Sequence, residues 1–112
     1  MNNKLFLLCP KARLEGRIHQ QIEGNHYFMT SLGGDFDFED PNFQAELDYL
    51  IKREGISEVC LVSEADKAVN AVTKVQKIAE QPILRERHIP LKNLVYDNAR
   101  EQFQERMMVH GF

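Results

Sequence analysis

Apolar residues are concentrated in three short segments of the chain, residues 4–9, 26–31 and 58–63, which we predict to be strands. The first and the third are almost unbroken apolar runs. Such runs are typical of strands covered on both faces, as in a parallel sheet, so we expect a small parallel sheet of about three strands.

Helical patterns separate these strands. Residues 13–23 and 63–79 place apolar side chains on one face at helical spacing. Between them, Asp40 is a helix N-cap followed by Pro41 at the first helical position, and Gly55 ends that helix. Alternation of strands and helices predicts right-handed crossovers and a three-layer α/β domain with helices flanking the sheet.

The C-terminal third is predicted to be helical as well. Pro82 and Pro90 bracket an irregular stretch, and residues 93–109 are predicted to form a last helix with Asn93 as its cap. The apolar stripe of that helix would consist of Val95, Ala99, Phe103 and Met107.

Composition narrows the functional classes. The chain has 112 residues, which suits a single domain over residues 1–112, and a net charge of −3 with acids and bases intermixed. We expect no nucleic-acid or membrane partner, since there is no basic face and no apolar run near the ~18 residues of a membrane span. The apolar run Leu5 to Leu8 is too short for a signal sequence. We therefore expect a cytoplasmic protein in which Cys9 and Cys60 form no disulfide.

In open parallel sheets, ligands bind at the carboxyl ends of the strands. Polar or glycine residues follow each predicted strand, and three cations among them favour a small anion as ligand. The candidate ligand-binding residues are Cys9, Lys11, Arg13, Ser31, Gly33, Gly34, Glu64, Asp66 and Lys67. The alternative is that these loops are polar only because strand-to-helix loops usually are.

In order and spacing, these loops resemble the active-site segments of the β-class carbonic anhydrases. Residues 9–13 read Cys-Pro-Lys-Ala-Arg where the family has Cys-x-Asp-x-Arg, and residues 31–35 read Ser-Leu-Gly-Gly-Asp where it has Arg-Asn-Ala-Gly-Asn. Residues 63–68 read Ser-Glu-Ala-Asp-Lys-Ala in place of Gly-His-x-x-Cys-Gly. The helix at residues 43–50 also has its counterpart. The resemblance covers residues 3–80 and implies that the first strand lies between the second and the third.

The departures from the family pattern concern its zinc. The resemblance implies that Cys9, Glu64 and Lys67 stand at the three positions of the family's zinc ligands. Glu64 replaces the family's His, and Lys67 replaces its second Cys. Zinc takes about four donors, preferably thiolates and imidazoles, whereas a lysine ammonium repels a dication. Lys11 also replaces the family's Asp. We therefore expect no metal, no other cofactor and no hydration of carbon dioxide, because water without zinc keeps a pKa far above neutral and supplies little hydroxide.

The sequence also predicts one ion pair and the environment of the histidines. Glu64 and Lys67, on one turn of the predicted helix, would form an ion pair at the zinc position. The four histidines are scattered without an i, i+4 pair and are predicted to be exposed or locally hydrogen-bonded. They are His19, His26, His88 and His110.

Three functions remain open from the sequence. The first is a non-catalytic carbonic anhydrase-like protein, a pseudoenzyme, that binds a small anion or acts as a regulatory module. The second is another kind of enzyme that uses Cys9 as a reactive thiol, with a pKa lowered by Lys11 and Arg13. The third is a purely structural or oligomerising protein.

A homodimer is the partner that we expect, since the family usually dimerises. The acidic-aromatic loop that contains Phe36 and Phe38, or the apolar residues 107–112, would provide its surface. The alternative for both segments is packing within the chain.

Overall fold

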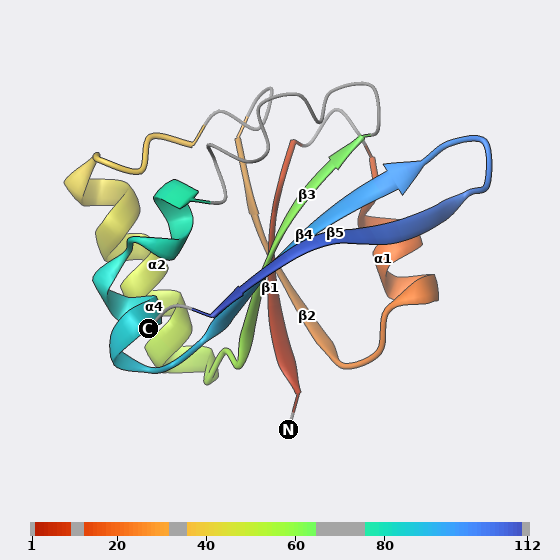
Figure 1. Cartoon of the computed structure of the whole chain (residues 1–112). Coiled ribbons are helices and arrows are strands. Elements are labelled where there is room, and N and C mark those ends of the chain that lie inside the picture. The colour runs from red at the N-terminus through yellow and green to blue at the C-terminus, as the bar shows by residue number, and fades with distance from the viewer. Residues whose placement is uncertain (1, 10–12, 32–35, 65–75, 111–112) are drawn as a thin grey trace.

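The computed structural model describes residues 2–9, 13–31, 36–64 and 76–110, the last five by their backbone only. A single sheet in the order β2-β1-β3-β4-β5 forms its centre (Figure 1). The elements are β1 (Asn3–Leu8), α1 (Glu15–Gln21), β2 (Asn25–Thr30), α2 (Pro41–Glu54), β3 (Glu58–Glu64), α4 (Pro82–Glu86), β4 (Pro90–Asp97) and β5 (Gln102–His110). The expected α/β class and the order of the first three strands are confirmed. The number of strands was wrong, since the sheet has five.

Strands β1 to β4 are parallel, and β5 runs antiparallel to β4. The apolar run of β1 is buried on both faces, as predicted. Leu5 and Leu7 pack with Leu47 and Ile51 of α2. Phe6 and Leu8 pack on the opposite face with Ile18 of α1 and with Leu14, just before that helix. Helices α2 and α4 therefore cover one face of the sheet and α1 the other (Figure 1).

The predicted boundaries of α2 are confirmed. The Asp40 carboxylate accepts a hydrogen bond of 2.9 Å from the backbone N–H of Asn42, and Pro41 occupies the first turn. Gly55 ends the helix in the left-handed conformation, with φ of +59°. A residue without Cβ adopts this conformation without steric strain.

A hairpin replaces the helix predicted over residues 93–109. Asn93 is a buried residue within β4 and not a helix cap. The Asp97 carboxylate accepts hydrogen bonds from the backbone N–H groups of Ala99 and Arg100, at 2.9 and 3.3 Å. These bonds form the turn into β5, where Phe103 packs on Tyr96 with ring centroids 5.0 Å apart. Pro82 likewise begins the short helix α4 and not an irregular stretch.

The helix predicted over residues 63–79 is only partly described. Ser63 and Glu64 belong to β3 and are not helical. Residues 76–79 are helical, and residues 65–75 lie outside the described part of the chain. The prediction that Glu64 is helical was therefore wrong, and its predicted ion-pair partner Lys67 lies outside the described residues.

Within the described residues, no helix is both long and apolar enough to cross a membrane.

Candidate functional site

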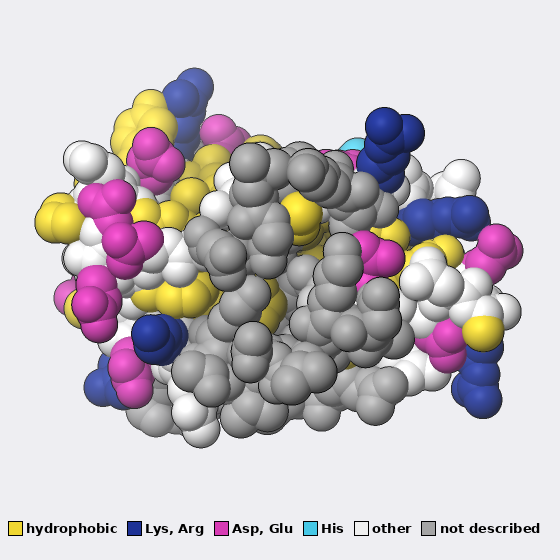
Figure 2. Space-filling model, turned by 90° about the horizontal axis from the view of Figure 1, so that it is seen from above, with side chains coloured by type: hydrophobic (Ala, Val, Ile, Leu, Met, Phe, Trp, Pro, Cys, Tyr) yellow, Lys and Arg dark blue, Asp and Glu magenta, His cyan; other side chains and the backbone are white. Residues whose placement is uncertain are grey.

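The carboxyl ends of β1, β2 and β3 lie along one edge of the sheet. Leu8 pairs with Thr30, and Leu7 pairs with both Met29 and Leu61. The backbone N–H of Ser31 donates to the carbonyl of Leu8 over 3.2 Å, which extends the pairing by one residue. Figure 2 looks onto this edge, with acidic side chains gathered on the side where α2 lies.

This edge brings together three of the candidate residues. Cys9 and Ser31 directly follow β1 and β2, Glu64 is the last residue of β3, and all three are half-buried. Arg13 is exposed and has a left-handed backbone, with φ of +54°, at the entry to α1. The other candidates lie outside the described residues: Lys11, Gly33, Gly34, Asp66 and Lys67.

Helix α1 contributes less to an anion site than the sequence suggested. It has seven residues, and Leu14 at its start provides no side-chain cap. The partial charge at a helix terminus grows from aligned peptide dipoles, and a helix of two turns has few of them. The short helix α1 alone is therefore a weak source of attraction for an anion.

Solved structures of known proteins share this arrangement of strands and helices. One of two tetrameric β-carbonic anhydrases from Sordaria macrospora matches with a TM-score of 0.79 and 12% identity, over 96% of this chain and 82% of its own. The fold is that of the β-carbonic anhydrases. CafD of Aspergillus fumigatus matches with a TM-score of 0.75 and 11% identity, over 96% of this chain and 90% of its own. The Coccomyxa β-carbonic anhydrase, solved with acetazolamide, has a TM-score of 0.67 and 12% identity, over 98% of this chain and 74% of its own.

By sequence alone, no family profile and no curated protein matches the chain. The likeness to β-carbonic anhydrases is therefore one of fold.

At the zinc position that the resemblance implies, the residue types differ from the ligands of a β-carbonic anhydrase zinc ion. Cys9 supplies one sulfur and Glu64 a carboxylate, and both follow or end strands at this edge. Lys67, at the position that the resemblance gives to the second thiolate, is a cation and has no lone pair to donate while protonated. Among the described residues, no group of three or more His, Cys, Asp or Glu side chains is placed to hold a metal.

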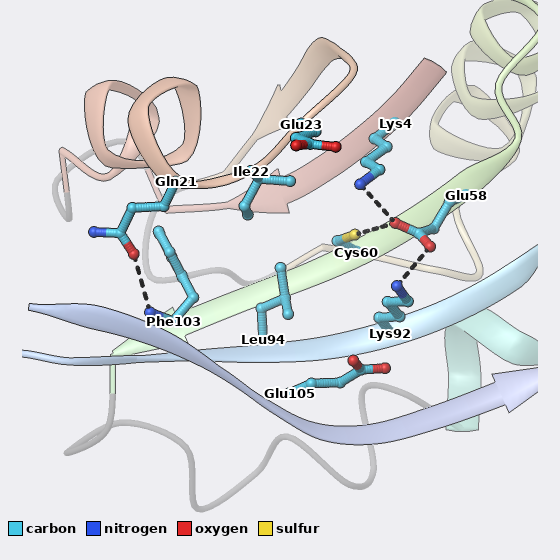
Figure 3. Close-up of a pocket in the computed structure, with 10 residues that line it drawn as sticks. All are labelled: Lys4, Gln21, Ile22, Glu23, Glu58, Cys60, Lys92, Leu94, Phe103 and Glu105. Carbon is cyan, nitrogen blue, oxygen red and sulfur yellow. Dashed lines mark hydrogen bonds and ion pairs between the residues drawn. The ribbon is translucent and has the colours of Figure 1, made fainter. Parts of the chain in front are cut away.

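A second polar centre, missed by the sequence analysis, lies on the α1 face of the sheet. The Glu58 carboxylate is 2.9 Å from the ammonium of Lys92 and 3.9 Å from that of Lys4 (Figure 3). The Cys60 thiol donates to the same carboxylate over 3.5 Å. These side chains line a cavity of about 380 Å³ together with Gln21, Ile22, Glu23, Leu94, Phe103 and Glu105.

The polar part of this cavity is an ion cluster in which two ammonium groups share one carboxylate. Burial raises the pKa of the Cys60 thiol, and the charge of Glu58 raises it further. The thiol therefore stays protonated and unreactive at neutral pH. The hydrogen bond to Glu58 raises the pKa of Lys92, so the lysine remains a cation. Cys60 belongs to the buried core, with 1% exposure.

The sequence contains the residues of this cluster, but their proximity can be predicted only from the register of the sheet. Lys4 pairs with Glu58, and Cys60 pairs with Lys92 on the next strand. Because residues 93–109 were assigned to a helix, no strand was available to bring Lys92 beside Glu58.

Proposed function

We propose that this chain is a non-catalytic protein with the β-carbonic anhydrase fold that binds a small anion at the carboxyl edge of its sheet. The observation that carries the proposal is the change of charge at the position of the family zinc. Lys67 stands where the resemblance places a thiolate ligand, and Lys11 stands where it places an aspartate. Such an edge disfavours a dication and favours an anion.

Arg13 and the two lysines would supply the contacts. A guanidinium binds a planar oxyanion such as bicarbonate through two parallel hydrogen bonds, and lysines act as point charges. Arg13 is exposed just before α1, so its side chain is free to turn toward the carboxyl edge from which α1 begins. Hydration of carbon dioxide is not part of this function, since lysines replace a zinc ligand and an aspartate of the family pattern.

A cytoplasmic homodimer completes the proposal. The Sordaria β-carbonic anhydrases are tetrameric, which makes self-association plausible for a chain of this fold. The loop with Phe36 and Phe38 favours packing within the chain, because the centroids of these rings lie 5.6 and 5.5 Å from that of Phe43 on α2. Residues 107–110 belong to the edge strand β5 and are the better dimer surface. Light scattering on the eluted protein tests this point, and a monomer at high concentration contradicts it.

Anion binding is tested by thermal shift with bicarbonate, phosphate and sulfate. A bound anion stabilises the folded state by about 2.7 kcal/mol at about 100 times its Kd. We expect at least one anion to raise the melting temperature of the wild-type protein, and Lys67→Ala and Arg13→Ala to abolish the shift. Lys52→Ala is the matched control, since Lys52 is an exposed cation in the last turn of α2. No shift with any anion, or an equal loss in the control, contradicts the proposal.

The non-catalytic part is tested separately, by a carbon dioxide hydration assay on protein loaded with zinc. We expect the rate of the uncatalysed reaction. Turnover that is lost in Cys9→Ser overturns this part of the proposal.

A further inference from the structure

Two histidines that are separated in the sequence meet on the α1 side of the sheet. His19 lies in the last turn of α1 and His26 is the second residue of β2. Their Nδ1 atoms are 2.8 Å apart, and their ring centroids are 4.8 Å apart. Gly24, with φ of +104°, lies in the turn that brings the two elements back together.

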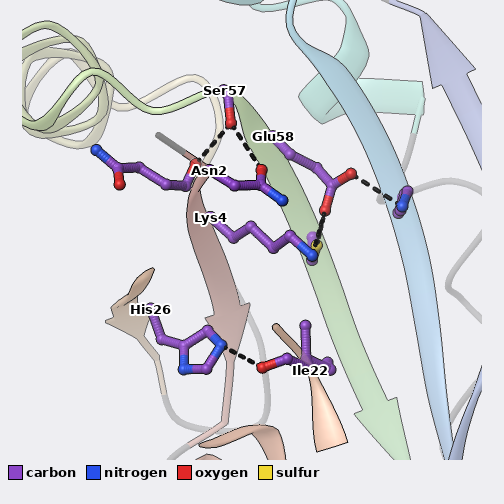
Figure 4. A network of polar contacts seen from close by, with 9 residues as sticks. Asn2, Lys4, Ile22, His26, Ser57 and Glu58 are labelled. Atoms are coloured by element: carbon purple, nitrogen blue, oxygen red, sulfur yellow. Dashed lines mark hydrogen bonds and ion pairs between the residues drawn. The ribbon is translucent and has the colours of Figure 1, made fainter. Parts of the chain in front are cut away.

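The contact with the Ile22 carbonyl assigns one proton on the His26 ring. His26 Nε2 lies 2.7 Å from the carbonyl oxygen of Ile22, which can only accept, so Nε2 carries a hydrogen (Figure 4). In the neutral ring, Nδ1 of His26 is then a lone-pair acceptor. Nδ1 of His19 must supply the hydrogen that lies between the two rings.

This arrangement is the one that metal-binding histidines use. A ligating histidine usually donates its second ring N–H to a carbonyl or carboxylate, which fixes the tautomer and orients the lone pair. Ile22 does this for His26. Phe6 and Phe28 pack against the two rings. The ring centroids of Phe6 and His26 are 5.5 Å apart, and those of Phe28 and His19 are 5.4 Å apart. When the exposed His19 shifts its hydrogen to Nε2, both Nδ1 lone pairs face the same gap.

We propose that His19 and His26 form a binding site for a divalent transition metal ion of the zinc and copper(II) class. Imidazole nitrogens suit these ions. With metal–nitrogen bonds of about 2.0–2.1 Å, two nitrogens on a tetrahedral ion are about 3.3 Å apart, so the rings must separate by about 0.5 Å from the present 2.8 Å. His19 is exposed and ends a short helix, so its ring can tilt by this amount.

The neighbouring residues determine how many protein ligands the site has and where it lies. Among the described residues, no third His, Cys, Asp or Glu completes a ligand cluster here, and the proposed site therefore has two protein ligands. Lys4 pairs with His26 in the sheet register, but its ammonium is directed to Glu58 (Figure 4). The pairing with Lys4 also places the site toward the amino end of β2, whereas the proposed anion edge follows Thr30. The two sites are therefore separate.

Calorimetric titration of the metal-free full chain with zinc ions tests the proposal. We expect one ion per chain, with an affinity at least tenfold weaker in His19→Ala and in His26→Ala. His88→Asn is the matched control, because His88 is an exposed histidine elsewhere and asparagine tolerates its φ of +53°. Nitrogen NMR of the labelled histidines provides a second readout, in which zinc shifts the Nδ1 resonances of His19 and His26 only.

Three results would overturn the site: no zinc binding up to millimolar concentration, equal affinity in the wild type and His19→Ala, or unshifted Nδ1 resonances. Cys9→Ser separates this proposal from the proposed function. Loss of zinc binding in Cys9→Ser but not in His19→Ala places the ion at the carboxyl edge, which contradicts both. Loss only in the histidine variants supports the new site and leaves the anion proposal to its own test.

Discussion

Lys92 on β4 and Glu58 on β3 face each other across neighbouring strands, with the ammonium 2.9 Å from the carboxylate. Lys4 on β1 adds a second cation to the same carboxylate, so one acidic side chain links three strands. Glu58 and Lys4 have side chains only 13% exposed, and that of Lys92 is 25% exposed. At this depth, solvent screens the ion pairs only in part.

Replacement of Glu58 by alanine should therefore destabilise the fold. Two part-buried lysines would lose their shared counter-charge, and we expect a loss of about 1–3 kcal/mol in the free energy of unfolding, between the values for exposed and buried pairs. Urea denaturation at pH 7 measures this. Glu46→Ala, at an exposed position on α2, is the control and should change stability by less than about 0.5 kcal/mol. Equal effects of the two substitutions would contradict the ion cluster.

The Cys60 thiol should make the fold sensitive to alkali. Its pKa is raised in the folded state, so its contribution to stability is complete below the unfolded value of 9.0 and is lost as pH rises above it. The unfolded chain then ionises while the folded thiol stays neutral. Relative to Cys60→Ala, the wild type should lose about 1.4 kcal/mol per pH unit above pH 9.

The measurement is the difference in unfolding free energy between the two proteins at pH 8 and at pH 10. The loss of stability from Lys92, whose pKa is raised from 10.5, begins at a pH above this range. A difference that does not vary with pH would show that the folded thiol ionises freely.

Gly24 should tolerate no side chain. A Cβ there would lie 2.5 Å from the carbonyl oxygen of Asn2, and φ is +104°. We expect Gly24→Ala to lower the free energy of unfolding by more than about 2 kcal/mol. Gly16→Ala is the matched control, because nothing lies within 4 Å of its Cβ position in α1. It should instead stabilise the protein by about 0.5–1 kcal/mol, and thermal unfolding of both variants distinguishes these signs.

The start of α2 should depend on the Asp40 side chain. Loss of its hydrogen bond to the backbone N–H of Asn42 in Asp40→Ala should reduce stability by about 0.5–2 kcal/mol. Asp40→Asn keeps an acceptor oxygen and should remain close to the wild type in chemical denaturation. If alanine and asparagine prove equally harmful, the negative charge and not the cap is what stabilises this helix.

Local signals in the sequence predicted the elements that depend on them. The apolar runs of β1 and β3 indicated buried parallel strands, and Asp40, Pro41 and Gly55 marked both ends of α2. The hairpin was missed because positions four apart share a face in a helix and also in a strand. Val95 lies in β4, Phe103 lies in β5, and Ala99 between them is an exposed turn residue.

The candidate sites also differ in how far the sequence could predict them. Cys9, Ser31 and Glu64 could be placed at one edge because strand ends in a parallel sheet meet there. The contact of His19 with His26 depends on the path by which α1 returns to β2, and no spacing rule describes that path. The cluster of Lys4, Glu58 and Lys92 depends on the register of three strands. Both of their pairings, β1 with β3 and β3 with β4, join parts that are distant in the chain.

The hairpin of β4 and β5 has a consequence for the order of assembly. Among the strands that the structure describes, this is the pairing that closes over a short turn, at residues 98–101, whereas each parallel pairing must first close a longer crossover. Hairpins form within microseconds, and distant pairings are slower. On the ribosome, the quickest pairing therefore emerges last. Until it does, β3 lacks its neighbour β4, and we expect the nascent chain to engage chaperones through that apolar edge.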